Sequence, residues 1–306
     1  MNENKTYSDL IKSEAQRLGF ADCGIAKATL LDTESANLKK WLNDGRHGEM
    51  QYMQNHFEKR VNPEKLVENA KSVISVIFNY YPSDTQPEGT YNISKYAYGK
   101  DYHFILKDKL RNLFNYLQNI IPEVQGRAFV DTAPVMDKVW AQKAGLGWIG
   151  KNTNLINPKL GSYVFIGELI VDIELDYDTP IIDYCGNCRK CIDACPTGAL
   201  TGPYQIDASK CISYLTIEKK GELPTEFQNK MDKWIFGCDA CQDVCPWNRK
   251  ATSHQSKELA PHPDLLKFKD EEWENLTKEK FNELFRKSAV KRTKYSGLKR
   301  NINFQQ

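Results

Sequence analysis

The sequence predicts an α+β protein in which an N-terminal α/β domain is followed by a small ferredoxin-like domain and a short basic helical segment. Helical and strand periodicities both occur before residue 170. Eight of the nine cysteines then fall between Cys185 and Cys245, and the stretch from Arg286 to Arg300 carries seven basic residues and no acidic one. These observations place the domain boundaries at 1–170, 171–250 and 251–306.

The first domain contains segments of both periodicities. Residues 6–20 and 101–121 have apolar residues at helical spacing, whereas 71–81 and 126–133 have the character of buried strands. Residues 154–173 predict two strands around a Pro-Gly turn. Together these segments predict one α/β domain that ends near residue 170.

Composition and chain length describe an ordinary globular protein of about two domains. Apolar residues make up 41% of the 306 residues and charged residues 27%, and the net charge is +2. No apolar run approaches the roughly 18 residues of a membrane span, and the first twenty residues lack the pattern of a secretory signal. We therefore expect a cytoplasmic protein without membrane partners, in which cysteines serve as metal ligands or catalytic groups rather than disulfides.

The cysteines form two sets of four. The first set has the pattern C-x2-C-x2-C-x3-C-P, by which bacterial ferredoxins give three thiolates to one [4Fe-4S] cluster and the fourth to its neighbour. The second set ends in the same way, but its first cysteine is separated from the others by residues 212–237, which we expect to be a helical insertion. The two sets are Cys185, Cys188, Cys191, Cys195 and Cys211, Cys238, Cys241, Cys245.

Ferredoxin geometry exchanges the last cysteine between the sets. One predicted cluster is held by Cys185, Cys188, Cys191 and Cys245, and the other by Cys195, Cys211, Cys238 and Cys241. Structural zinc is the alternative, but zinc sites usually contain two separated C-x2-C pairs, so the triple run favours two clusters that conduct electrons. Cys23 has no thiol or histidine nearby in sequence, and we expect it to be a small buried apolar residue.

The glycine-rich segment 144–154 resembles two nucleotide-binding patterns. Gly145, Gly147 and Gly150 match G-x-G-x-x-G, but a helix-like segment precedes them and strand-like residues follow, the reverse of the required context. Asn152 stands where a phosphate-binding loop has a hydroxyl residue. A loop that lets the backbone approach some other large polar ligand remains open.

Asp131 is the candidate acid. It follows a predicted strand, where a carboxylate can project into a cleft, and the apolar neighbours Phe129 and Val130 predict a raised pKa and proton transfer near neutral pH. The alternative is an aspartate that begins a turn or caps a helix starting at Val135.

Six motifs in order resemble the epoxyqueuosine reductase family: GEMQYM, YAYGKDYH, VDTAPVMDKVWAQKAGLGWIGKNTNLI, CGNCRKCIDACPTGAL, CDACQDVCPWN and GLKRN. The resemblance runs from about residue 45 to residue 301. It implies reduction of epoxyqueuosine to queuosine at the wobble position of tRNA, the last step of queuosine synthesis, by an oxidoreductase with cobalamin and two [4Fe-4S] clusters.

The resemblance also implies roles for particular residues. Electrons would pass through the clusters to a cobalamin held by the N-terminal domain, and the aspartate of V-D-T-A-P, Asp131, would protonate the departing oxygen. The expected cobalamin contacts are Arg60, Asp131, Lys151, Asn152 and Asn154.

A tRNA substrate implies a role for the basic segment. Tyr102 and His103 match a family motif near the substrate entrance, although Asp101 could simply cap a helix there and leave His103 on the surface. The residues expected on the anticodon arm are Lys291, Arg292, Lys294, Tyr295, Lys299 and Arg300, with the tyrosine stacking on a base; the alternative is a solvated helix end. Several family members continue into a helical repeat region that grips tRNA. This chain ends at Gln306, so we expect the basic segment and the ferredoxin-like domain to provide most of the affinity.

Two other functions are weighed against this one. A corrinoid reductive dehalogenase acting on a small molecule would not need the basic segment. An electron-transfer module without catalysis would not need the 170 residues before the clusters. We expect a monomer that receives electrons from a low-potential donor.

Overall fold

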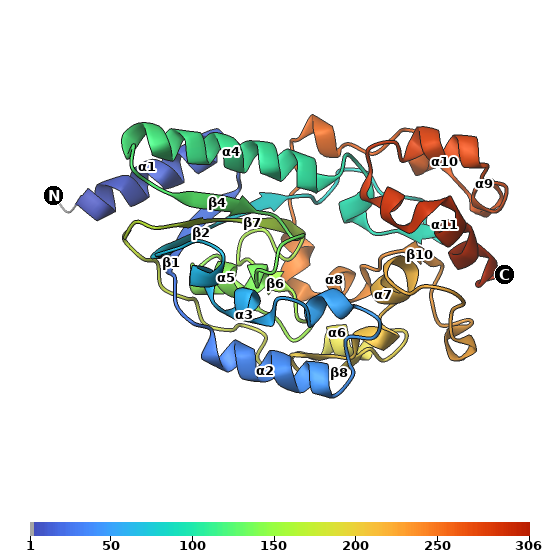
Figure 1. Cartoon of the computed structure of the whole chain (residues 1–306). Coiled ribbons are helices and arrows are strands. Elements are labelled where there is room, and N and C mark those ends of the chain that lie inside the picture. Colours follow the sequence, from blue (N-terminus) through green and yellow to red (C-terminus); the bar gives the residue numbers. More distant parts are fainter. Residues whose placement is uncertain (1–2) are drawn as a thin grey trace.

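The structure, a computed structural model, describes residues 3–306 and is built on a four-stranded sheet (Figure 1). The strand order is β1 (Asp22–Lys27), β2 (Ser72–Asn79), β7 (Val164–Val171) and β4 (Gly126–Phe129). Every neighbouring pair is antiparallel. The expected α/β class was therefore wrong for the N-terminal domain, because periodicity identifies strands but their relative direction depends on long-range pairing.

Helices cover both faces of this sheet. On one face lie α1 (Glu3–Arg17) and α4 (Tyr102–Ile120), and on the other lies α5 (Asp137–Lys143) (Figure 1). Side chains of β2 alternate accordingly, with Ile74 in the first core and Ile77 in the second.

Helix α4 is firmly attached to its face of the sheet. Its fully buried or nearly buried residues are Ile105, Leu106, Leu110, Leu113 and Leu117. At about 1.5–3 kcal/mol each, their burial contributes on the order of 10 kcal/mol. The beginning of α4, which carries Tyr102 and His103, is thereby held in a fixed position.

The cysteine-rich region folds into short elements. These are α6 (Lys190–Asp193), the hairpin β8 (Leu200–Gly202) and β9 (Gln205–Ile206), α7 (Ile212–Ile217) and α8 (Ala240–Asp243). The insertion 212–237 was expected to be helical, but α7 accounts for only its first part. Gly221 and Pro224 follow α7 and disfavour its continuation, and β10 (Trp234–Phe236) pairs in parallel with β3 (Asn92–Ile93).

The C-terminal segment is helical, as the sequence predicts. It contains α9 (Asp270–Glu274), α10 (Lys278–Leu284), the 3-10 helix η9 (Ala289–Thr293) and α11 (Lys294–Asn303). Its apolar side chains share one core with β3 and β10. The segment is therefore packed against both preceding regions.

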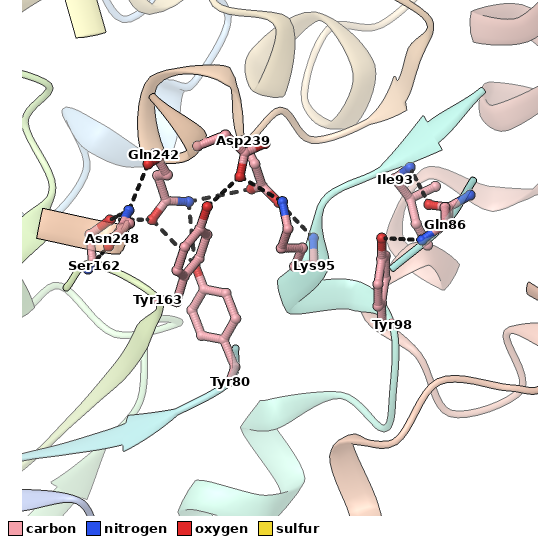
Figure 2. A network of polar contacts seen from close by, with 11 residues as sticks. Tyr80, Gln86, Ile93, Lys95, Tyr98, Ser162, Tyr163, Asp239, Gln242 and Asn248 are labelled. Carbon is pink, nitrogen blue, oxygen red and sulfur yellow. Dashed lines mark hydrogen bonds and ion pairs between the residues drawn. The ribbon is translucent and has the colours of Figure 1, made fainter. Parts of the chain in front are cut away.

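A buried polar network joins the second cysteine motif to the N-terminal domain (Figure 2). The Asp239 carboxylate accepts from the backbone N–H of Lys95 at 2.8 Å, and Ser162 Oγ donates to Gln242 Oε1 at 2.8 Å. Because buried polar groups are costly to separate from their partners, this network fixes the cysteine loops relative to the sheet.

Within the part of the chain that the structure describes, no helix combines the length and apolar character needed to cross a membrane.

Candidate redox and proton-transfer site

Asp131 lies two residues beyond the end of β4, in contact with the beginning of α4. The Tyr102 hydroxyl donates to Asp131 Oδ2 at 2.5 Å, and His103 Nε2 is 3.4 Å from the same oxygen. The Asp131 side chain is 54% exposed, and its backbone has a φ of 52°. The strand end therefore presents a carboxylate that two side chains of another element hold in place.

The beginning of α4 is shaped by Asp101. Its carboxylate accepts from the His103 backbone N–H at 3.0 Å and lies 2.7 Å from His103 Nδ1. The Tyr102 ring stacks on Phe165 and on His103, with centroids 4.2 Å apart in both pairs. The helix-cap interpretation of Asp101 is confirmed, and His103 is not merely on the surface, because it also contacts Asp131.

The charge states of Asp131 and His103 differ from those that the sequence predicts. Partial burial alone would raise the pKa of Asp131, but the contact with His103 and the hydrogen bond from Tyr102 outweigh it and lower that pKa. Burial likewise opposes the charge on His103, yet its hydrogen bond to Asp101 and its ion pair with Asp131 raise its pKa to about 9. The expected raised pKa of Asp131 was therefore wrong for this arrangement, in which His103 holds the proton.

One residue of the basic segment, Arg292, affects the charge of Asp131. The positive charge of Arg292 contributes to the lowered pKa of Asp131, and its guanidinium pairs with Glu218 at 2.6 Å. Glu218, which directly follows α7, carried no sequence signal, because its partner is distant in the chain.

The thiols lie in two neighbouring groups. Cys185, Cys188, Cys191 and Cys245 line one cavity of about 220 Å³ together with Tyr184 and Trp247. In the other group burial raises the pKa of Cys241, and the charges of Cys211 and Cys195 add to the effect. Cys23 lies apart from both groups. The expectation that it is buried is confirmed, and burial raises its pKa to about 12.

The spacing of the thiols bears on the kind of metal they fit. A tetrahedral zinc ion with Zn–S bonds of about 2.3 Å needs sulfur atoms about 3.8 Å apart. Within residues 3–306, no three cysteine sulfurs lie within 4.8 Å of one another. These thiols are therefore spread more widely than a tetrahedral zinc site requires. A group that does meet this limit is His262, Asp264 and Glu283, but Lys280 already bonds both carboxylates.

The loop 150–154 contacts the cysteine loops. Lys151 Nζ donates to the carbonyl oxygens of Gly186 and, at 3.0 Å, of Cys188. Asn152 Nδ2 is 3.4 Å from the carbonyl oxygen of Cys241, and Asn154 Nδ2 is 4.0 Å from its sulfur. These three predicted cobalamin residues therefore lie between the two thiol groups.

Arg60 lies elsewhere, on α3 (Phe57–Val61), and donates to the carbonyl oxygen of Tyr52 at 2.9 Å. The five predicted cobalamin residues therefore do not all contact one another. Gly147 leads from α5 into the hairpin β5 (Trp148–Ile149) and β6 (Leu155–Ile156), and a Cβ there would stand 2.3 Å from the carbonyl oxygen of Ile156. The glycine serves close backbone packing, and the strand-to-helix context of a dinucleotide site is not found in these described residues.

Most of the basic segment has internal partners. Arg300 donates to the carbonyl oxygens of Lys219 and Gly221, both at 2.8 Å, and of Leu215 at 3.1 Å. The Tyr295 hydroxyl, Lys291 and Lys299 bond Leu276, Asn282 and Glu274 respectively. Of the six residues expected on the anticodon arm, Arg292 and Lys294 are the exposed ones.

Family models match two parts of the chain. Residues 60–132 match the model described as epoxyqueuosine reductase QueG, DUF1730. Residues 184–248 match a 4Fe-4S double cluster binding domain.

Curated relatives match along nearly the whole chain. An epoxyqueuosine reductase from Cellulophaga algicola is 59% identical over 99% of both chains. That from Escherichia coli is 39% identical over 95% of this chain and 78% of its own.

Solved structures of epoxyqueuosine reductases also match nearly the whole chain. An epoxyqueuosine reductase bound to an epoxyqueuosine-modified tRNA-Tyr stem loop has a TM-score of 0.89 at 32% identity, covering 98% of this chain and 80% of the other. The structure from Bacillus subtilis, with an aspartate-bearing catalytic loop swung out of the active site, has the same TM-score at 31% identity and the same coverage. A reductive dehalogenase shares the fold at 16% identity, with a TM-score of 0.51 over 100% of this chain and 39% of its own.

Proposed function

The chain belongs to the epoxyqueuosine reductase family, and from this membership we propose that it reduces epoxyqueuosine in tRNA to queuosine. The observation that carries the proposal is 59% identity with an epoxyqueuosine reductase over 99% of both chains. The reaction breaks both C–O bonds of the epoxide, so it consumes two electrons and two protons and releases water.

Asp131 is the proposed proton donor to the epoxide oxygen. Tyr102 and His103 both contact its carboxylate, and His103 is protonated at neutral pH because its pKa is about 9. A substrate over Asp131 would displace water and raise the pKa of this carboxyl group, which favours transfer of the His103 proton through Asp131. The position of Tyr102 and His103 makes them part of this acid in addition to the expected contact with tRNA.

The double-cluster domain supplies electrons. The proposed ligands are those that the cysteine spacing predicts, with Cys185, Cys188, Cys191 and Cys245 on one cluster and Cys195, Cys211, Cys238 and Cys241 on the other. The common cavity of the first four supports this assignment. Bound clusters would carry single electrons from a low-potential donor.

Cobalamin is the proposed acceptor of these electrons, and it would supply a cobalt centre able to reduce the epoxide. The family resemblance supports it, as does the shared fold with a reductive dehalogenase for which B12-dependent dehalogenation has been described. Lys151, Asn152 and Asn154 would meet the cofactor on the side of the thiols, and Arg60 and Asp131 on the other. The Arg60 Nε atom is buried without a hydrogen-bond partner among the residues described, as expected for a group that awaits an acceptor.

The tRNA would lie across the basic segment, with Arg292 and Lys294 as its exposed phosphate contacts. Lys291, Tyr295, Lys299 and Arg300 would act mainly by holding the segment in place. We propose a cytoplasmic monomer. A dehalogenase function is less well supported, because the dehalogenase likeness is at 16% identity.

The test is anaerobic turnover. The protein is reconstituted with iron, sulfide and cobalamin, reduced, and mixed with tRNA that contains epoxyqueuosine, and the digested nucleosides are analysed by mass spectrometry. Loss of one oxygen mass is the expected result. Lack of conversion, with both clusters and cobalamin confirmed by spectroscopy, would assign the redox centres to another substrate, with halogenated small molecules tested next.

A further inference from the structure

Two carboxyl groups, one on a buried residue and one on a half-buried residue, lie between the sheet and α5, next to Asp131. Glu168 projects from the middle of β7 and is 0% exposed, and Asp137 is the first residue of α5. Both Glu168 carboxylate oxygens and Asp137 Oδ1 are buried and lack a conventional hydrogen-bond donor among the residues described. Such groups are rare in folded proteins, since an unpaired buried carboxylate is strongly disfavoured.

The pair becomes satisfied if it shares a proton. Burial, reinforced by the charge of Asp137, raises the pKa of Glu168 well above its usual range, and burial likewise raises the pKa of Asp137. The two side chains are hydrogen-bonding neighbours, so a proton on one satisfies the other, and two adjacent carboxyl groups in a dry site do not both ionise. At neutral pH the pair therefore holds a proton.

The pair is connected to the proposed acid through the backbone. The backbone N–H groups of Asp131 and of Asp137 itself stabilise the charged form of the Asp137 carboxyl group and so oppose the rise in its pKa. Phe129, two residues before Asp131, is the direct partner of Glu168 across the sheet. A change in the charge of the pair would therefore affect the loop that carries Asp131. The φ of Asp131 is 52°, which is uncommon for a residue with a side chain.

Other charged groups face the pair. Arg60 of α3 and Lys138 of α5 interact favourably with Asp137, and the Asp131 carboxylate interacts unfavourably with both members. On β2, Ser75 is paired with Glu168 in the sheet, and its buried hydroxyl has no partner in the described part of the chain. No cation among these described groups bonds directly to Glu168, which leaves a proton as its neutralising charge.

The shared proton stays on the pair during turnover. Its release would leave two adjacent carboxylates ionised in a dry site. The Asp131 side chain is 54% exposed, so solvent can return protons to it directly. The pair therefore acts on the position of the Asp131 loop.

We propose that Glu168 and Asp137 are a proton-sharing pair that positions the Asp131 loop. This inference rests on the proposed function for the role of Asp131, but the presence of the shared proton does not depend on the substrate. Both are positioning residues, because they reach the reacting atoms only through Asp131.

The test combines infrared spectroscopy with kinetics on the reconstituted holoenzyme. The probe variant is Glu168→Gln, which keeps the size of the side chain and removes the titrating group. The matched control is Glu14→Gln, because Glu14 is also buried but is ion-paired with Arg17 on α1. Wild-type protein at pH 7.5 should show the C=O band of a buried protonated carboxylic acid, which the Glu168→Gln variant should lose and the control should keep.

The kinetic result should differ in kind as well as size. We expect kcat of Glu168→Gln to fall on the order of 10-fold, less than the ~100-fold or greater loss expected for removal of the acid itself. The loss should appear in kcat and not in KM for tRNA, because the Asp131 loop would meet the epoxide whereas the basic segment would meet the tRNA.

The outcomes separate this inference from the proposed function. Absence of the band from wild-type protein, or a Glu168→Gln variant with the wild-type kcat, would overturn the proton-sharing pair as the group that positions the Asp131 loop. If the band is present and assigned to Glu168 but epoxyqueuosine is not reduced, the proposed function fails and the proton-sharing pair remains.

Discussion

The charge pair between Asp131 and His103 can be tested by replacing Asp131 with Asn. Asp131 is one of two carboxylates that raise the pKa of His103 to about 9, and Asp101 is the other. Loss of one charge should lower the pKa of His103 by about 1 unit or more, while Asp101 keeps it above 6.5. Because the acid is also removed, turnover should fall at least ~100-fold with cluster and cobalamin spectra unchanged.

The pair also makes stability depend on pH. A histidine pKa of about 9 instead of 6.5 corresponds to about 3 kcal/mol, which we discount to about 1–2 kcal/mol for solvent screening. The pKa is raised on folding, so this contribution is fully present below pH 6.5 and is lost as the pH rises through about 9. In the Asp131→Asn variant, the decrease in the free energy of unfolding over this pH range should be smaller.

The assay is an NMR titration of the imidazole signals between pH 5 and 10. The chain contains five histidines, and a His103→Gln variant identifies the signal of interest. Asp108→Asn is the matched control, because Asp108 lies on the same helix and pairs with Arg111 at the surface. A wild-type His103 that titrates near 6.5, or one whose pKa is unchanged by Asp131→Asn, would refute the proposed charge pair.

Four further substitutions test other parts of the site. Cys211→Ser should remove about half of the bound iron and leave the signal of one cluster, and unchanged iron content would contradict the ligand assignment. Arg292→Glu should raise KM for tRNA and flatten the salt dependence of KM. Arg300→Glu should mainly lower the free energy of unfolding, by on the order of 2 kcal/mol, because three carbonyl oxygens lose their donor. Equal salt slopes in both variants would contradict these different roles of Arg292 and Arg300. Lys151→Met should weaken the cluster nearest Cys188 in anaerobic iron-release measurements, since the ammonium bonds the carbonyl oxygens of that loop, and an unaltered release rate would argue against such a role.

Several features were readable from sequence because they are local. The spacing of the cysteines restricts which thiols can reach a common cluster, and the strand before Asp131 ends where the apolar pattern ends. The buried strand 71–81 appears as β2, and the reversed context of the glycine-rich segment appears as α5 followed by a hairpin. These properties depend on neighbours within a few residues.

Other features depend on partners that are distant in the chain. Strand β1 and helix α2 (Asp32–Asn43) were not anticipated, and the insertion is α-helical only at its start. The basic segment looked uniform in sequence, but packing turned Arg300 inward and brought Arg292 to Glu218. Electrostatic roles of this kind are assigned by tertiary contacts.

The sequence by itself determined the thiol pattern, the acidic residue at a strand end and the family to which both belong. The tertiary structure alone decided the protonation of the site, because the pKa of Asp131 is governed by His103 and Tyr102 on another helix. It also placed Glu168 opposite Phe129 and beside Asp137, which no spacing along the chain indicates. Covalent connectivity fixes which groups are neighbours in sequence, whereas burial and charge, which set proton affinity, arise only when the sheet and its helices pack together.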